Sequence, residues 1–295
     1  ELMKLLKEGI TLIHEHTTID LSGVKQIDDT NLNCFDETVE EFKTLYELGV
    51  RNIVDVTADG MGRNVDYVNR VQELTGINII QSTGYYKEPF LPDYVYTMSV
   101  ETLADKMIKE MVEGIGETNT KAGLIGEIGT SKDVIEPIEL KVFEAACLAV
   151  KKHPAVISTH TSLSTMALEQ AHFFLEQGMD PSRIIIGHQD LKGDLDQINQ
   201  LIDMGFYVGF DTIGKNNYFP DTTRAELLYK LQESGRIDKV CISLDITRKS
   251  NMKYQGGIGY SYLFTDFIPM LKATGVTQSS IDKMLVHNPK ALFKE

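Results

Sequence analysis

The chain has 295 residues, a length that fits one large α/β barrel or two smaller domains. Hydrophobic residues make up 42% and charged residues 24%, so a chain of this length can bury a large core without disulfides or structural metals. The formal net charge of −14 argues against a nucleic-acid partner, because binding to a phosphate backbone usually needs a basic face.

Neither the cysteines nor the apolar runs indicate an exported or membrane protein. The three cysteines, Cys34, Cys147 and Cys241, form no zinc-ligand pair and no CxxC motif, so we expect free thiols. No apolar run approaches the ~20 residues that span a bilayer, and residues 1–16 lack the pattern of a signal peptide. We therefore expect a cytoplasmic protein with no membrane partner.

The chain alternates between short apolar runs rich in Val and Ile and longer amphipathic stretches. Such runs are typical of parallel strands buried on both faces. They are residues 10–16, 51–57, 78–84, 122–129, 155–161, 183–189, 206–212 and 239–245. Strands alternating with helices in this way predict a single-domain (β/α)8 TIM barrel over residues 1–295. A doubly wound sheet would need a Gly-rich loop after the first strand for a nucleotide, where this chain has HEHTTIDLSG.

The stretches between the apolar runs have the periodicity of helices. Clear examples are residues 36–49, 99–115, 137–152 and 165–178. Asp36 and Ser99 are candidate N-caps, because their side chains can accept a hydrogen bond from the first turn. Glycines that can take a positive φ mark the helix ends. They are Gly49, Gly76, Gly178, Gly205 and Gly235.

Six potential metal ligands fall at or near the C-terminal ends of predicted strands. They are His14, His16, Glu127, His160, His188 and Asp245. Alternation along the first strand points His14 and His16 to one side and Glu15 to the other. Imidazoles and carboxylates suit zinc, and also manganese, iron or cobalt. Burying such a set at one barrel mouth would be costly without a cation, so we interpret it as a metal site. The remaining histidines, His153, His172 and His287, fall in helices or at helix ends and are expected to be structural or on the surface.

With these residues the sequence resembles the amidohydrolase superfamily and, within it, the phosphotriesterase-like family. The resemblance lies in TLIHEHTTIDLSG, KAGLIGEIGTS, ISTHTS, IIIGHQD, GFDTIGKNNYFPD, SLDITR and the tail HNPKALF, and it covers nearly the whole chain. It is strongest to the branch called phosphotriesterase homology proteins. One position departs from phosphotriesterase, whose fourth strand carries a carbamylated lysine as the bridging ligand, because Glu127 stands there instead. This departure argues against organophosphate hydrolysis as the native activity.

The resemblance implies a hydrolase that depends on two divalent metal ions, with zinc as the first choice and manganese, iron or cobalt as alternatives. The more buried ion would take His14, His16, Glu127 and Asp245, and the more exposed one Glu127, His160 and His188. The ions would activate a water between them. Asp245 would accept its proton and deliver it to the leaving group. Family members also suggest a homodimer.

Three further side chains are candidates for substrate binding. Lys215 follows the seventh strand and Arg248 follows the eighth, so both are expected at the barrel mouth, where they could bind an anionic small molecule. The alternative is that each pairs with a nearby carboxylate, such as Asp211 or Asp221. Tyr86 aligns with a tyrosine that lactonases of the family place over the substrate, and a role in packing is an equal alternative.

The sequence therefore predicts hydrolysis of a small ester or lactone, such as a phosphorylated or carboxylated sugar lactone. One alternative is a phosphodiesterase or deoxyribonuclease of the same superfamily, although Ile13 stands where those enzymes usually have an aspartate. Another is a metal-binding barrel without catalytic activity, which the presence of all six ligands disfavours. Arg63, after the second strand, is a weaker candidate for the pocket.

Overall fold

Parallel strands follow one another in chain order in the computed structural model, which describes residues 5–294. They are β1 (Ile10–Glu15), β4 (Val50–Asp55), β5 (Asn78–Ile80) with its continuation β6 (Ser82–Thr83), β7 (Leu124–Thr130), β8 (Val156–Thr161), β9 (Ile184–Ile186), β10 (Tyr207–Phe210) and β11 (Val240–Ile242). Six of the eight predicted apolar runs contain one of these strands or the β5–β6 pair, whereas β4 begins at Val50 and β7 ends at Thr130, each one residue outside its predicted run. Neighbours in this order pair in parallel, which confirms the predicted (β/α)8 barrel.

The interior of the barrel is filled by one apolar cluster to which every strand position contributes. Its strand members are Ile13, Val54, Ile80, Leu124, Val156, Ile185, Tyr207 and Cys241. Because side chains alternate along a strand, the neighbouring Leu12 instead belongs to the larger core that the helices cover. Leu292 and Phe293, near the end of the chain, also pack in the interior cluster. This end of the barrel is therefore a packed core, which leaves polar groups to the other end.

Side chains join the last strand to the first. The Ser243 hydroxyl donates to the Glu15 carboxylate at 2.7 Å and accepts from the backbone N–H of His14 at 3.3 Å. Glu15 also accepts from the backbone nitrogens of Leu244 and Ile246 at 2.8 and 3.2 Å. As predicted, Glu15 points away from its two histidine neighbours, and it holds the segment that leads out of β11.

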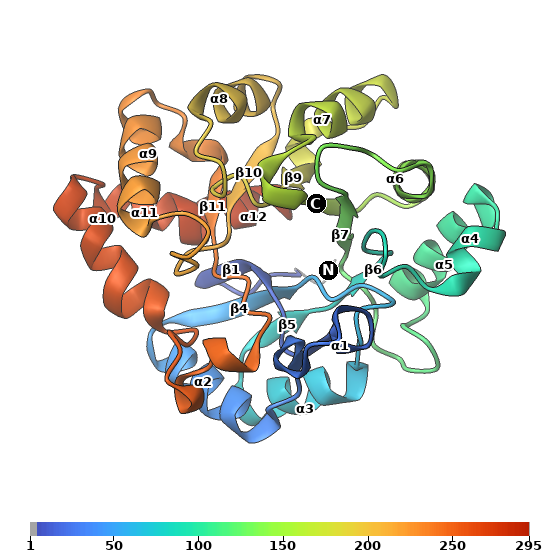
Figure 1. Cartoon of the computed structure of the whole chain (residues 1–295), viewed down its shortest axis with the longest axis horizontal. Coiled ribbons are helices and arrows are strands. Elements are labelled where there is room, and N and C mark those ends of the chain that lie inside the picture. The colour runs from blue at the N-terminus through green and yellow to red at the C-terminus, as the bar shows by residue number, and fades with distance from the viewer. Residues whose placement is uncertain (1–4, 295) are drawn as a thin grey trace.

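Helices surround the strands (Figure 1). The longer ones are α2 (Phe35–Glu47), α3 (Val65–Thr75), α5 (Val100–Val112), α6 (Pro137–Lys152), α7 (Ala167–Glu176), α8 (Leu195–Asp203), α9 (Asp221–Glu233) and α10 (Ile268–Thr274). The shorter ones are α1 (Ser22–Lys25), α4 (Asp93–Thr97), α11 (Gln278–Asp282) and α12 (Asn288–Leu292), with π-helical turns at Leu263–Phe267 and Lys283–His287. A short antiparallel pair, β2 (Ile19–Asp20) and β3 (Asn31–Leu32), brackets α1. Each longer helix buries an apolar face, as Val39, Phe42 and Leu45 of α2 show.

The predicted helix ends are confirmed more fully than the predicted starts. Ser99 caps α5 and accepts from the backbone N–H of Thr102 at 3.1 Å. The prediction for Asp36 was wrong: Cys34 is the N-cap of α2, and Asp36 already lies inside the first turn. A carboxylate is favourable there as well, because it faces the positive end of the helix dipole. All of the predicted terminal glycines have positive φ, between 71° and 100°.

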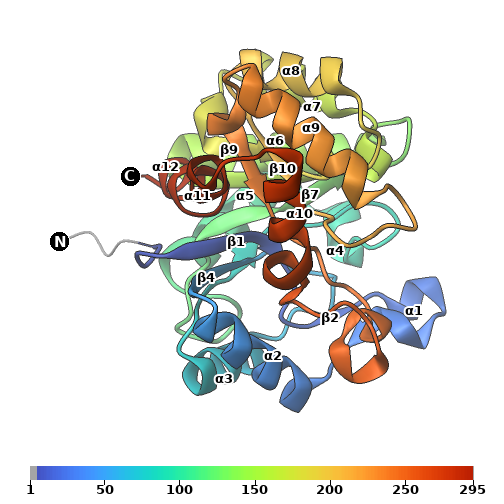
Figure 2. The same cartoon turned by 90° about the vertical axis from the view of Figure 1, so that its left-hand side faces the viewer.

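The loops that follow the strands gather on one side of the molecule. In Figure 2, α1, which follows β1, lies on the opposite side from α11 and α12. Barrels of this type carry their sites on the side where the strands end. The three cysteines are free and buried. Within residues 5–294, no helix is both long and apolar enough to cross a membrane.

Candidate metal centre

The structure brings all six potential ligands together where the strands end. One group consists of His14, His16, Glu127 and Asp245, and the other of Glu127, His160 and His188. Within each group, the ligand atoms lie within 4.8 Å of one another. Glu127 belongs to both groups, so its carboxylate lies between them.

The distances within the first group are nearly uniform. The Nε2 atoms of His14 and His16 lie 3.4 Å from the two carboxylate oxygens of Glu127, Oε2 and Oε1 respectively. The same nitrogens lie 3.5 and 3.2 Å from Oδ1 of Asp245. Two ligand atoms that each lie about 2.1 Å from one cation are separated by distances of this order. The four side chains therefore surround a space of the right size for a metal ion.

The second group is built around the Oε2 atom of the same glutamate. Nδ1 of His160 lies 3.3 Å from Glu127 Oε2, and Nε2 of His188 lies 3.6 Å from it. The two imidazole rings are nearly perpendicular, with centroids 4.6 Å apart. Both nitrogens face one carboxylate oxygen, which leaves room for a second cation beside the first group.

Several of these atoms lack the hydrogen bonds that burial normally demands. Nε2 of His14, Nε2 of His16 and Oε2 of Glu127 are buried, and none has a hydrogen-bond partner within residues 5–294. Each unsatisfied buried polar atom costs about 1–3 kcal/mol. Divalent cations would satisfy all three, and nitrogen and carboxylate ligands suit zinc, manganese, iron and cobalt. The residues present therefore fit a pair of metal ions.

Burial and neighbouring charges shift the pKa values of the imidazoles in opposite directions. Burial lowers the pKa of His16, but neighbouring carboxylates, above all Asp245, overcome this effect and raise it to about 9. Burial is likewise overcome at His188 by the charge of Asp211, which raises the pKa to about 10. At His160 burial prevails and lowers the pKa to about 4. The pKa of His14 is raised as well, so three of the four ligand imidazoles would release a proton when a cation binds.

The backbone turns sharply at two of the ligands. His188 has φ 57° and Asp245 has φ 52°, in the left-handed region that residues other than glycine rarely adopt. Both follow the last residue of a strand closely, since β9 ends at Ile186 and β11 ends at Ile242. Strained backbone of this kind is concentrated at functional sites, where surrounding contacts hold it in place.

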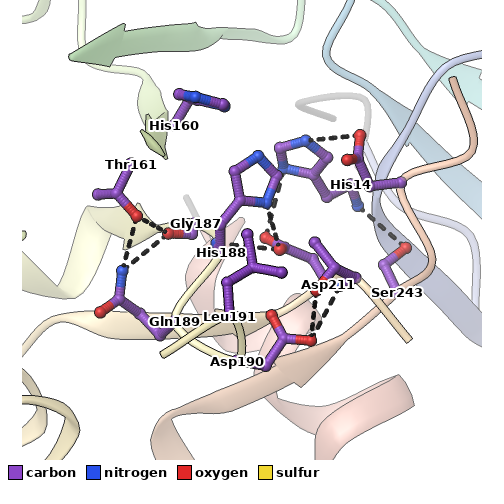
Figure 3. A network of polar contacts seen from close by, with 12 residues as sticks. His14, His160, Thr161, Gly187, His188, Gln189, Asp190, Leu191, Asp211 and Ser243 are labelled. Carbon is purple, nitrogen blue, oxygen red and sulfur yellow. Dashed lines mark hydrogen bonds and ion pairs between the residues drawn. The ribbon is translucent and has the colours of Figure 1, made fainter. Parts of the chain in front are cut away.

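Asp211, which follows β10, is a buried residue that the sequence analysis did not place in the site. Its Oδ1 lies 2.7 Å from Nδ1 of His188 and accepts from the backbone N–H of that residue at 2.9 Å (Figure 3). A carboxylate can only accept, so Nδ1 carries a proton, and Nε2 is the nitrogen that faces Glu127 and becomes free to bind a cation once it loses its own proton. Carboxylates commonly orient ligating histidines in this way. The position was visible in the sequence as the end of the seventh predicted strand.

Further polar contacts fix the ends of β8, β9 and β10 (Figure 3). The amide of Gln189 donates to the Thr161 hydroxyl at 3.0 Å and to the carbonyl of Gly187 at 2.8 Å. Beneath them, the fully buried guanidinium of Arg224 donates to Asp190 at 2.8 Å. These bonds hold the turn that carries His188 in one conformation.

A cavity of about 350 Å³ opens above the ligand cluster, and Tyr86, Lys215 and Arg248 line it together with five of the six ligands. The hydroxyl of Tyr86 lies 3.2 Å from Nδ1 of His160, and the two rings meet edge to face. The structure therefore places all three candidate substrate residues at the barrel mouth.

Lys215 and Arg248, the two cationic side chains predicted at the mouth, each pair with a carboxylate. Lys215 Nζ lies 2.5 Å from Oδ2 of Asp245, and Arg248 donates to Asp29 at 3.4 Å. The alternative that each pairs with a nearby carboxylate is confirmed, but the two examples named are not the partners, because Asp211 is turned towards His188. Asp221 instead forms an ion pair with a buried arginine of its own helix.

Arg63, the weaker candidate, does not line this cavity. Its guanidinium forms two hydrogen bonds, of 2.7 and 3.0 Å, with the carboxylate of Glu110, and a third with the carbonyl of Ser82. It therefore joins α5 to β6, and its role is structural.

Comparisons with known proteins agree with this geometry. The family model described as "Phosphotriesterase family" matches residues 2–293. The phosphotriesterase homology protein of Escherichia coli is 48% identical over 97% of this chain and 98% of its own. A crystal structure of that protein, with phosphate in its active site, has a TM-score of 0.96 and covers 97% of this chain and 99% of the other.

Several relatives have names that state a hydrolytic activity, and two of them match nearly the whole chain in both directions. The aryldialkylphosphatase of Saccharolobus solfataricus is 34% identical, over 97% of this chain and 95% of its own. The phospho-furanose lactonase of Mycoplasmopsis synoviae is 32% identical, over 97% of this chain and 88% of its own. The chain therefore belongs to the phosphotriesterase family and is a hydrolase.

Proposed function

We propose that this hydrolase uses two divalent metal ions to hydrolyse a small anionic ester or lactone, with phosphorylated or carboxylated sugar lactones as the substrate class. The observation that carries the proposal is the single carboxylate of Glu127, which is shared by two groups of ligands. The unpartnered buried atoms of His14 and His16 support it.

In this proposal, each group of ligands holds one ion. His14, His16, Glu127 and Asp245 hold the first, and Glu127, His160 and His188 hold the second. Zinc is the first choice, with manganese, iron or cobalt as alternatives. When bound, two such ions lower the pKa of a water towards neutrality and polarise the bond to be broken. Glu127, with two oxygens, takes the bridging role for which phosphotriesterase uses a modified lysine.

The side chains of the mouth supply the remaining steps. Asp245 accepts the proton of the attacking water on Oδ2 and delivers it to the leaving oxygen. The Lys215 ammonium lies 2.5 Å from Oδ2 of Asp245 and keeps this carboxylate directed towards the cavity. Tyr86 packs against His160 and forms a wall for the substrate ring. Arg248, held by Asp29, adds positive charge at the rim.

Two facts about relatives support an anionic lactone. A phospho-furanose lactonase shares nearly the full length of this chain. The structure of the Escherichia coli homologue holds phosphate in its active site. Cations that line the cavity of a chain with net charge −14 point the same way. A homodimer stays a prediction, which the mass in solution would test.

The proposal is tested by metal analysis of protein prepared without chelator, followed by a pH-indicator screen over lactones and phosphorylated sugar lactones. We expect close to two equivalents of metal and acid release that Asp245→Asn abolishes. The left-handed backbone at Asp245 suits Asn well, so this variant changes charge with little strain. Two bound metals without turnover of any ester or lactone would instead support a barrel without catalytic activity. Nicking of plasmid DNA would favour the nuclease alternative.

A further inference from the structure

Two lysines at the cavity mouth have no carboxylate partner within residues 5–294. Lys25 is the last residue of α1, and Lys87 follows β6; both line the cavity above the ligand cluster. The Nζ atoms lie 5.8 and 5.4 Å from the centroid of the same ring, that of the buried Phe90. The only hydrogen bond of the Lys87 ammonium within these residues goes to the backbone carbonyl of Glu88.

The other two cations of the cavity differ in this respect. Lys215 is engaged by Asp245 and Arg248 by Asp29. An incoming anion would have to compete with these carboxylates for either side chain. Neither of the lysines beside Phe90 is paired with a carboxylate in this way, so an anionic ligand could bind their ammonium groups without displacing one.

The surroundings lower the pKa of both lysines. The side chain of Lys25 is exposed, but partial desolvation at the mouth still lowers its pKa, and the positive charge of Arg248 lowers it further. Burial also lowers the pKa of Lys87, although nearby glutamates oppose the effect. The face of Phe90 offers weak cation–π stabilisation, which does not neutralise charge. An anion seated between the two ammonium groups would do so.

We propose that Lys25 and Lys87, which both lie beside Phe90, form a subsite for a phosphomonoester group on the substrate. A phosphomonoester carries nearly two negative charges at neutral pH, which matches two ammonium groups. Apolar side chains, including Leu21 and Met61, line the same cavity and would contact the carbon skeleton. The inference rests on the proposed function for the reaction, but the binding of the anion can be measured without turnover.

The test compares ribose 5-phosphate with ribose as ligands of the metal-loaded full chain, by isothermal titration calorimetry. The variants are Lys25→Met, Lys87→Met and the double variant. Lys132→Met is the matched control, because Lys132 is an exposed lysine after β7 that does not line the cavity. We expect the wild-type protein to prefer ribose 5-phosphate. The double variant should reduce that preference by at least about tenfold, and each single variant by about threefold.

Four outcomes would overturn the subsite. The double variant could keep the wild-type preference, the Lys132→Met control could lose it equally, or wild-type protein could bind both sugars alike. Loss of the preference in Arg248→Met alone would likewise place the anion on the other side chain. A preference that depends on Lys25 and Lys87 in a protein that hydrolyses no lactone would uphold the subsite and contradict only the proposed reaction.

Discussion

The role of Asp211 can be tested by a substitution that changes one interaction. Asp211→Asn keeps the size of the side chain but removes its charge. In the wild-type protein, Oδ1 of Asp211 accepts from both Nδ1 and the backbone nitrogen of His188, at 2.7 and 2.9 Å. The amide oxygen of Asn can still accept both bonds, but without the negative charge that strengthens them, and its NH2 group would oppose the Nδ1 proton in the alternative rotamer. The imidazole of His188 is therefore held less firmly in its orientation.

The structure also indicates where the loss should appear. Removing such an outer carboxylate typically lowers metal affinity 10–100-fold, or about 1.4–2.7 kcal/mol. Oδ2 of Asp211 lies 3.5 Å from Nδ1 of His14 and makes no hydrogen bond there. We therefore expect the full loss in the group of Glu127, His160 and His188. The affinity of the other group should change by less than about threefold.

Competition between the protein and a chelating dye, titrated with zinc, resolves the two affinities. Asp203→Asn is the control, because Asp203 is an exposed aspartate that pairs with Arg236 and belongs to neither group of ligands. The variant could instead weaken both sites equally, or neither. Either result would refute the argument that Asp211 acts by orienting His188.

Three more predictions follow from the charges described. His16 and His188, with pKa values of about 9 and 10, must lose protons to bind metal. The apparent zinc affinity should therefore rise at least about tenfold per pH unit between about pH 6 and 8. An affinity that does not change with pH in a chelator competition would contradict this. Glu15→Ala removes the acceptor for three donors that follow β11. The free energy of unfolding in urea should therefore fall by about 2–4 kcal/mol. A fall of less than about 1 kcal/mol would show that packing alone joins the last strand to the first. Glu110→Gln should cost about 2–3 kcal/mol at pH 7 by leaving Arg63 without its ion pair. Burial raises the pKa of Glu110, but the charge of Arg63 outweighs burial and holds the pKa below its usual value. The difference in stability between wild type and variant should therefore shrink as the pH falls below about 4. A difference that stays constant with pH would argue against the ion pair.

The strands and the clustering of the six ligands could both be predicted from the sequence, and the reason is physical. Residues near the ends of parallel barrel strands must meet at the same mouth, so the positions of His14, Glu127 and Asp245 along the chain already imply proximity. The paired histidines of the first strand obey the two-residue period of a strand. No knowledge of loop conformation was needed for either step.

What the sequence did not reveal depends on side-chain direction and on loops. Asp211 was counted among possible partners of the mouth cations, but the sharp turn at His188 brings that imidazole against it instead. Lys25 lies in a short helix that the apolar pattern does not mark, and Lys87 lies in a loop. Their approach to Phe90 is a tertiary contact with no local signal.

The hydrogen bonds of Glu15 join residues separated by about 230 positions, which is most of the length of the chain. Contacts of such high sequence separation form late in folding, because a long loop must close first. The first ligand group has the same property, since His14 and His16 lie at one end of the chain and Asp245 near the other. During synthesis, a ribosome-bound chain that has not yet released its last strand cannot complete this centre. Binding of the first metal ion is thereby coupled to synthesis of the segment that carries Asp245.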